Sequence, residues 1–146
     1  TAAGSGVDGV IIPDLPPEEA KSLLSLANKY KVDVISFVAP TTSGERLKRI
    51  VKLAKGFIYY VSLTGVTGVR KALPADLVKN IKAIKKNTSK PVCAGFGVSS
   101  PSQIARINKV ADGVIVGSAI VNKIKENRSR PDLVRRVTSF VRQLKY

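Results

Sequence analysis

The sequence predicts an α/β fold in which parallel strands alternate with helices. Apolar runs rich in β-branched residues recur five times along the 146 residues, and each is followed by a segment with the apolar period of an amphipathic helix. The predicted strands are apolar along their length, which is typical of a parallel sheet covered by helices. Three of them lead into glycine-rich loops, at 65–68, 95–97 and 117–118. We therefore expect one α/β domain over residues 1–146.

The first unit has its strand in the second half of the run 7–12, followed by a proline-rich turn. Pro17 is expected to open the helix, with Glu18 and Glu19 in the first turn, where the helix dipole favours negative charge. The residues expected on its buried face are Ala20, Leu23, Leu24 and Ala27.

The second unit has its strand at 32–38. Thr42 and Glu45 have the spacing of a capping box at the start of its helix, and Gly56 is expected to end that helix. Its predicted apolar stripe consists of Leu47, Ile50, Val51 and Ala54.

The last three strands are expected at 57–63, 92–94 and 114–116. A helix over about 75–87 would bury Leu77, Ile81 and Ile84. Ser100, Pro101 and Gln103 have the pattern of an N-cap, a first-turn proline and a capping-box partner, ahead of a helix that would bury Ile104, Ile107 and Val110. A short helix is expected after Ser118, and an amphipathic helix over about 131–146.

A short repeat joins the two ends of the chain. Asp8-Gly9-Val10-Ile11 returns as Asp112-Gly113-Val114-Ile115, each time leading into a strand. Repeated units of this kind build a TIM (β/α)₈ barrel, which takes about 250 residues. Five units therefore predict an incomplete barrel with two unpaired sheet edges, and an open doubly wound sheet is the competing architecture.

Composition limits the chemistry. The chain has 25 Lys and Arg against 10 Asp and Glu, a net charge of +15, no histidine and one cysteine. Without histidine, acid–base catalysis would depend on carboxylates, and Cys93 lies in an apolar run typical of an inert buried thiol. No apolar run is long enough to span a membrane. The charge makes nucleic-acid binding an alternative, but no aromatic residue alternates with the lysines of 79–90 to stack bases.

The last two glycine-rich loops predict a phosphate site. In TIM barrels, a phosphate is often held by the loops after the last two strands and by the N-terminus of a short helix. Gly117 and Ser118 would open such a helix, presenting backbone N–H groups and a hydroxyl to an anion. Gly97 would let the backbone approach the phosphate oxygens closely. Glycines that serve only tight turns are the alternative.

Carboxylates are scarce where catalysis would need them. Most of the ten acidic residues lie at predicted helix starts or ahead of strands. Only Asp14 follows a strand at its carboxyl end, in a proline-rich loop that would serve equally well as a turn or a docking surface. The pair of catalytic acids expected of an enzyme without histidine is missing from this chain.

Five segments, at 6–16, 38–42, 60–68, 95–99 and 117–121, resemble the tryptophan synthase α subunit family, in the family's order and over almost the whole chain. The Ser-x-x-Gly-Val-Thr-Gly motif at 62–68 is the most specific of them. The resemblance implies a TIM barrel that cleaves indole-3-glycerol phosphate to indole and glyceraldehyde 3-phosphate in tryptophan biosynthesis, by a retro-aldol lyase reaction without a cofactor. It also implies a heterotetramer of two α and two β subunits, in which the β subunit uses pyridoxal phosphate. The implied location is the cytoplasm, or a plastid.

The family's functional residues carry over by matching motif. The residues implied to bind the substrate phosphate are Gly68, Gly97, Gly117 and Ser118. Phe96 and Ile11 would line the indole pocket, and Tyr59 would lie beside the catalytic carboxylate. Thr67 would help to position a mobile loop that closes the site, and the segment 14–16 would face the β subunit.

The chain departs from the family in one respect. The family's catalytic Glu and Asp come from the second strand and the loop after it, and the five units here would correspond to the fourth to eighth, the C-terminal portion of the barrel. Thr1-Ala2-Ala3-Gly4 also has the pattern of a helix end, which suggests a longer parent chain. We expect little lyase activity from this chain alone. The alternatives are a non-catalytic phosphate-binding half-barrel or partner-binding module, and a nucleic-acid-binding protein.

Overall fold

A single parallel sheet organises the chain. The structure is a computed structural model that describes residues 2–61 and 76–145. Its strands are β1 (Gly9–Ile11), β2 (Asp33–Val38), β3 (Ile58–Val61), β4 (Val92–Gly95) and β5 (Gly113–Val114). They lie in the order β1-β2-β3-β4-β5, and each neighbouring pair is parallel. The predicted alternation of parallel strands and helices is therefore confirmed, with β1 and β5 at the two ends of the described sheet.

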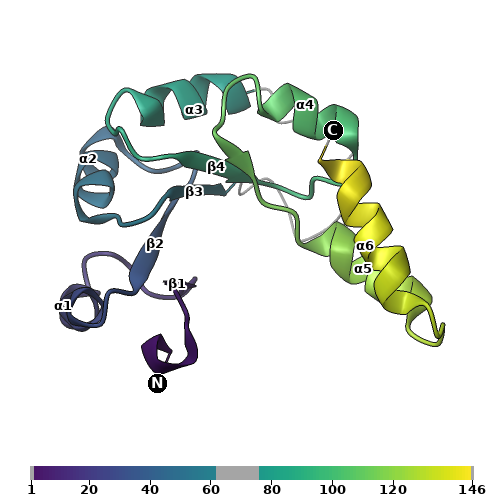
Figure 1. The fold of residues 1–146 in the computed structure, drawn as a ribbon. Coiled ribbons are helices and arrows are strands. Elements are labelled where there is room, and N and C mark those ends of the chain that lie inside the picture. The colour runs from purple at the N-terminus through teal and green to yellow at the C-terminus, as the bar shows by residue number, and fades with distance from the viewer. Residues whose placement is uncertain (1, 62–75, 146) are drawn as a thin grey trace.

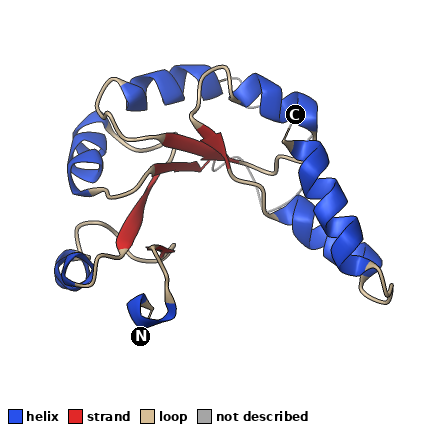
Figure 2. Ribbon diagram, in the orientation of Figure 1, coloured by secondary structure: helices blue, strands red, loops and turns tan. Residues whose placement is uncertain are grey.

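The α-helices lie along the outer side of the curved sheet or continue past its β5 end, and the short 3₁₀ helix lies beside the N-terminus, so that the described chain has the outline of an arch (Figures 1 and 2). They are the 3₁₀ helix Ala3–Ser5 and the α-helices α1 (Lys21–Lys29), α2 (Gly44–Leu53), α3 (Leu77–Lys85), α4 (Pro101–Ile107), α5 (Ser118–Asn127) and α6 (Leu133–Leu144). None of these helices covers the inner side of the arch in Figure 1. This curvature, with helices on one side only, is that of part of a barrel and argues against a doubly wound sheet.

The hydrophobic core lies between the sheet and the helices. Its strand residues include Ile58, Tyr60, Val92 and Ala94, each at most 1% exposed. They pack with the predicted apolar stripes of α2, α3 and α4, namely Leu47, Ile50, Val51 and Ala54, then Leu77, Ile81 and Ile84, then Ile104 and Ile107, with Val110 at the margin. The other face of the sheet carries the register row Phe37, Tyr59 and Cys93, all half-buried. We call this the inner face.

Helix α1 begins at Lys21, so the prediction that Pro17 opens it is wrong. The segment ahead of the helix forms turns, in which Glu19 N–H donates to Pro16 O at 3.0 Å and Ala20 N–H donates to Pro17 O at 3.3 Å. Glu18 does not sit in a first helical turn but reaches Arg46 of α2, 28 residues along the chain. An ion pair between residues distant in sequence thus joins this segment to α2.

The start of α2 also differs from the prediction. The N-cap is Ser43, whose Oγ accepts from Arg46 N–H at 3.3 Å. Thr42, the predicted cap, instead accepts from Ala39 N–H at 3.0 Å and closes the turn after β2. Both hydroxyls could cap a helix, and Thr42 is engaged by the backbone behind it.

Asp112 fastens three elements at the amino ends of the strands. One carboxylate oxygen accepts from Lys85 Nζ of α3 at 2.7 Å, and the other accepts from Val92 N–H of β4 at 2.9 Å. Asp112 N–H donates in turn to Val92 O at 2.9 Å. The Lys85 hydrogen bond, and then the Val92 one, hold the pKa of this carboxyl below its ordinary value of 3.8. The second copy of the Asp-Gly repeat therefore has a structural role.

Replacing Asp112 with alanine should lower the free energy of unfolding by about 1 kcal/mol near pH 7, because two hydrogen bonds to a carboxylate are lost. Since the folded pKa is lowered, the wild-type contribution is present above the ordinary pKa of 3.8 and disappears as pH falls through the lowered value. Urea denaturation at pH 7 and in acid measures both effects. Glu126→Ala, which removes one exposed carboxylate paired with Lys123 at 3.5 Å, is the control and should change little. Equal losses in both variants would contradict this role of Asp112.

Candidate functional site

The candidate site lies at the carboxyl ends of β4 and β5. Ala94 pairs with Val114 in parallel register, and Ile115 N–H donates to Ala94 O at 2.9 Å, just beyond the end of β5. Neighbouring parallel strands end at the same edge of a sheet. The loop after Gly95 and the loop that contains Gly117 therefore leave the sheet side by side.

The loop after β4 is fixed in place by the start of α4. Gly97 has a φ of 74°, in the left-handed region that favours glycine. Ser100 caps α4 with the predicted capping box, in which Gln103 N–H donates to Ser100 Oγ and Ser100 N–H donates to Gln103 Oε1. Ser99 N–H donates to the same Gln103 oxygen at 2.9 Å. The prediction for this helix start is confirmed, and the capping box also holds the end of the loop.

Helix α5 begins beside that loop. Gly117 is its N-cap, and its carbonyl accepts from Ile120 N–H at 2.9 Å and Val121 N–H at 3.1 Å. The first turn carries no acidic residue, so no carboxylate neutralises the positive end of the helix dipole. A Cβ added at Gly117 would meet no atom of the described residues within 4 Å, so this helix start is open on that side. With the half-buried Ser118 hydroxyl, this helix start has the chemistry of an anion site.

Tyr59 points from the inner face toward the same edge. It pairs in register with Cys93, yet its hydroxyl would lie only 2.6 Å from a Cβ added at Gly95, two residues nearer the carboxyl end. Its ring packs against Phe37, with ring centroids 5.2 Å apart. Burial raises the pKa of Tyr59 above its ordinary value of 10.0, so the phenol is neutral near pH 7. The absence of a side chain at Gly95 is what lets the ring lean this way.

The other predicted site residues are dispersed. Phe96 is 8% exposed and belongs to the core cluster. Ile11 is 46% exposed and lies on β1, which β2 and β3 separate from β4. Thr67 and Gly68 lie outside the described residues. The structure thus brings Gly97, Gly117 and Ser118 to adjacent loops, and the roles assigned to all of these residues stay predictions.

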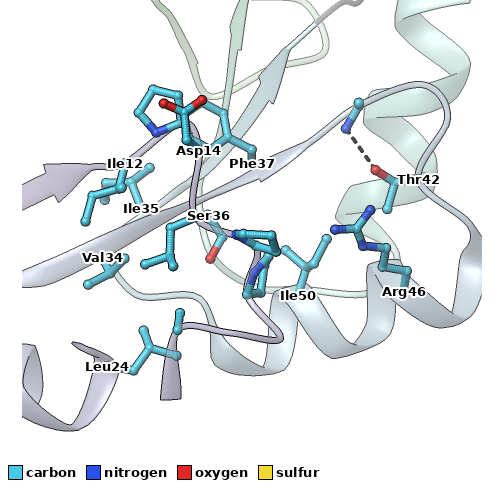
Figure 3. A pocket seen from close by; sticks show the side chains of 16 residues that line it. Ile12, Asp14, Leu24, Val34, Ile35, Ser36, Phe37, Thr42, Arg46 and Ile50 are labelled. Atoms are coloured by element: carbon cyan, nitrogen blue, oxygen red, sulfur yellow. Dashed lines mark hydrogen bonds between the residues drawn. The ribbon is translucent and has the colours of Figure 1, made fainter. Parts of the chain in front are cut away.

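A second feature was not predicted from the sequence. A groove of about 250 Å³ lies beneath the proline-rich loop 13–17, between α1, β2 and α2 (Figure 3). Its lining is mainly apolar, with Leu24, Val34 and Ile50 among its walls, while Asp14 and Ser36 contribute polar groups. The sequence named Leu24 and Ile50 as buried helix residues and Asp14 as a loop residue, but it did not predict the groove, because the groove is assembled from segments far apart in the chain.

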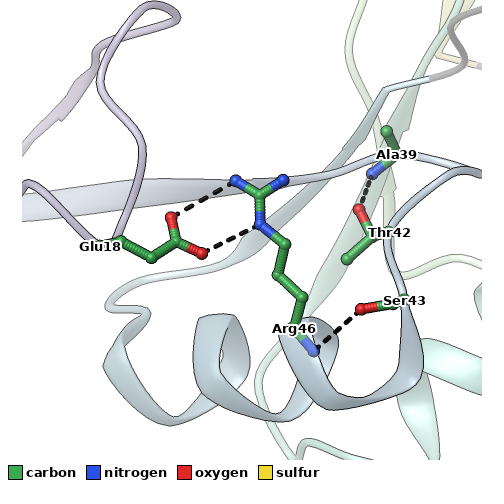
Figure 4. Close-up of polar contacts among 5 residues, drawn as sticks. All are labelled: Glu18, Ala39, Thr42, Ser43 and Arg46. Carbon is green, nitrogen blue, oxygen red and sulfur yellow. Dashed lines mark hydrogen bonds and ion pairs between the residues drawn. The ribbon is translucent and has the colours of Figure 1, made fainter.

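An ion pair links Arg46, which lines this groove, to Glu18, which follows the lining residue Pro17. Arg46 Nε and Nη2 donate to the two carboxylate oxygens of Glu18, at 3.0 and 3.4 Å (Figure 4). A backbone hydrogen bond at Glu18, followed by the Arg46 contact, lowers the pKa of this carboxyl below 4.5. The pair is exposed, so it fixes the position of the loop more than it stabilises the fold.

Neither a metal cluster nor a reactive thiol is found in the described residues. No group of three or more Cys, Asp or Glu side chains is placed there to hold a metal ion. Cys93 is half-buried, and burial raises the pKa of its thiol. Within the described part of the chain, no helix is long and apolar enough to cross a membrane.

Comparison with known proteins gives consistent matches over the whole chain. A family model described as tryptophan synthase alpha chain matches residues 1–146. The tryptophan synthase alpha chain of Carboxydothermus hydrogenoformans is 52% identical over 136 residues, which cover 91% of this chain and 51% of the relative. That of Geobacter sulfurreducens is 44% identical over 144 residues, covering 99% of this chain and 54% of the relative. The chain spans about half the length of the curated relatives it matches.

Solved structures agree with the sequence matches. A structure of Mycobacterium tuberculosis tryptophan synthase has a TM-score of 0.86 and 36% identity, covering 98% of this chain and 52% of that chain. A tryptophan synthase complex from Pyrococcus furiosus has a TM-score of 0.85 and 33% identity, covering 98% and 56%. The arch described above is thus similar to about half of a larger fold.

Gly95→Ala should destabilise the chain by about 1–3 kcal/mol, because the new Cβ would force the Tyr59 ring away from Phe37. Gly117→Ala is the matched control and should be nearly neutral, since it has open space and a φ of −118°. Denaturant unfolding measures stability, and ultraviolet titration of the tyrosines should show a lowered pKa for Tyr59 only in the first variant. Equal stability of the two variants would contradict the tight contact.

Proposed function

The chain belongs to the tryptophan synthase alpha chain family, and from this premise we propose that it supplies the phosphate-binding part of an indole-3-glycerol phosphate lyase. The reaction is the retro-aldol cleavage of that substrate to indole and glyceraldehyde 3-phosphate. The observation that supports this role best is the pairing of β4 with β5, which places two glycine-bearing loops and the start of α5 at one edge of the sheet.

In this proposal, the phosphate is held by main-chain groups. Gly97 brings the backbone of its loop close to the ligand, and the first N–H groups of α5, at Ser118 and beyond, point at the phosphate oxygens. The Ser118 hydroxyl adds a donor, and by family resemblance Gly68 completes the set. The dipole of α5 favours the dianion.

The indole end of the substrate would lie over the inner face. Tyr59, held by Phe37 and by the space at Gly95, offers a neutral phenol beside the position of the family's catalytic carboxylate. Phe96 and Ile11 are the proposed apolar walls, and Thr67 the residue that positions the closing loop.

A retro-aldol cleavage needs a base to take a hydroxyl proton and an acid to protonate the departing carbon. This chain has no histidine, and the loops after β2, β4 and β5 carry no carboxylate. Asp14, Glu18 and Glu19 lie in the loop after β1, where Glu18 is held by Arg46. We therefore propose that these 146 residues bind substrate but do not cleave it by themselves.

The partner in this proposal is a tryptophan synthase β subunit. One matched structure is described as an α2β2 tryptophan synthase complex from Pyrococcus furiosus. The loop 14–16, exposed at Asp14 and closing the groove of about 250 Å³, would lie on the partner side. The α chain needs no cofactor, and pyridoxal phosphate belongs to the β subunit.

A non-catalytic phosphate-binding half-barrel is the second candidate, favoured by the scarcity of carboxylates at the carboxyl ends of the strands. It shares the phosphate site with the first proposal. The lyase proposal predicts that lyase activity appears when the missing part of the barrel is added, and the half-barrel proposal predicts that it does not.

The purified 146-residue chain should release no indole from indole-3-glycerol phosphate above a heat-denatured control. Mixing it with the segment of the Carboxydothermus hydrogenoformans relative that precedes the matched region should restore indole release, because that segment would bring the missing acid and base. Indole production by the chain alone would contradict the first statement. A mixture that forms a complex, binds phosphate and stays inactive would favour the half-barrel.

Inorganic phosphate and glycerol 3-phosphate should raise the melting temperature of the chain. At a ligand concentration of about 100 times Kd, the free energy of unfolding should rise by about 2.7 kcal/mol. Ser118→Asp should abolish this response without destabilising the fold, because a carboxylate at a helix N-terminus suits the dipole and repels phosphate. Asn122→Asp, one turn later on the exposed side of α5, makes the same charge change and should keep the response. The phosphate assignment fails if Ser118→Asp responds like Asn122→Asp.

A further inference from the structure

The second half of α2 carries a cluster of exposed cations. We call the α2 basic face the set Lys48, Arg49, Lys52 and Lys55, which lie along the helix and its exit and are all exposed. Helix α2 starts after the carboxyl end of β2 and ends ahead of β3. The α2 basic face therefore lies toward the amino ends of the strands, away from the loops of the candidate phosphate site.

These four cations are not neutralised by close ion pairs within the described part of the chain. Glu18, on the α1 side, is held by Arg46, and Arg49 adds only a smaller Coulombic contribution that lowers the pKa of Glu18. Lys48 and Lys52 are four residues apart and Arg49 and Lys52 three, spacings at which like charges on a helix repel by about 0.2–0.5 kcal/mol a pair. A bound anionic partner would relieve this repulsion.

Two grooves flank the α2 basic face, and Lys52 lines both. The α1–α2 groove, of about 460 Å³, is lined by Pro17, Glu18, Lys21, Arg49, Lys52 and Leu53. The α2–α3 groove, of about 300 Å³, is lined by Lys48, Val51, Lys52, Asn87, Thr88, Ser89 and Lys90 and includes no carboxylate. Leu53, which is 43% exposed, gives the first groove an apolar wall, while the second offers ammonium and hydroxyl donors.

We propose that the α2 basic face is a docking surface for an acidic protein segment that places an apolar side chain in the α1–α2 groove and carboxylates on the lysines. The charge of the surface is complementary to an anionic partner, and the apolar wall at Leu53 would contact an apolar side chain of that partner. Neither groove has an aromatic lining residue on which a base would stack, which disfavours single-stranded nucleic acid. The surface is separate from the proposed lyase site, so either proposal can fail alone.

Fluorescence anisotropy with two labelled peptides tests the proposal. One is a short polyglutamate peptide with a central leucine, and the other has alanine in its place. The leucine peptide should bind more tightly to the 146-residue chain. The triple variant Lys48→Gln, Arg49→Gln, Lys52→Gln should weaken binding of both peptides by about tenfold, from three lost charge contacts. Leu53→Ser, which leaves every charge in place, should reduce the affinity for the leucine peptide to that for the alanine peptide.

The matched control is Lys79→Gln, Lys82→Gln, Lys86→Gln, which removes three exposed cations from α3 and its exit. Its peptide affinity should stay close to that of the unmodified chain. An equal loss in this control would show that net charge alone drives binding and would overturn the proposal. Tighter binding of a single-stranded oligonucleotide, unaffected by Leu53→Ser, would overturn it in favour of nucleic acid, and absence of peptide binding would overturn it outright.

Discussion

Parallel pairing of neighbouring strands is the constraint on which the candidate site depends. Because β4 and β5 run in the same direction and pair at Ala94 and Val114, their following loops must leave at one edge. The backbone pairing of the two strands is enough to bring Gly97 and Ser118 to neighbouring loops. The apolar residues that hold helices on the outer face keep this pairing in place, and the inner face is left for Phe37 and Tyr59.

Much of the fold follows from local patterns. Leu77, Ile81 and Ile84 have helical spacing and are all buried in the core, and Ser100 caps α4 as its sequence predicts, because the partner atoms lie within the same turn. The predictions failed at two helix starts where a competing contact engages the predicted residue, one distant in sequence and one within the preceding turn. Glu18 leaves the predicted first helical turn to meet Arg46, and Thr42 is taken by Ala39, so that Ser43 becomes the cap.

The glycine-rich loops of the candidate site were predicted from local sequence, but the contacts between distant segments were not. Glycine at 97 and 117 marks loops in any sequence, and strand order alone then brings those loops together. The Tyr59 ring occupies the space that a side chain at residue 95 would fill. Because these two residues lie on different strands, no local sequence pattern predicts this contact. The groove beneath loop 13–17 is lined by residues of α1, β2 and α2, so no single segment of the sequence predicts it.

The position of Cys93 has a practical consequence. It is the only cysteine in the sequence, and it belongs to the row of residues on the inner side of the sheet, between Tyr59 and Gly113. Its thiol is half-buried, and burial raises the thiol pKa, so the rate at which thiol reagents modify Cys93 will depend on what shields that surface. The modification rate of Cys93 therefore reports whether another polypeptide covers the inner face of the sheet.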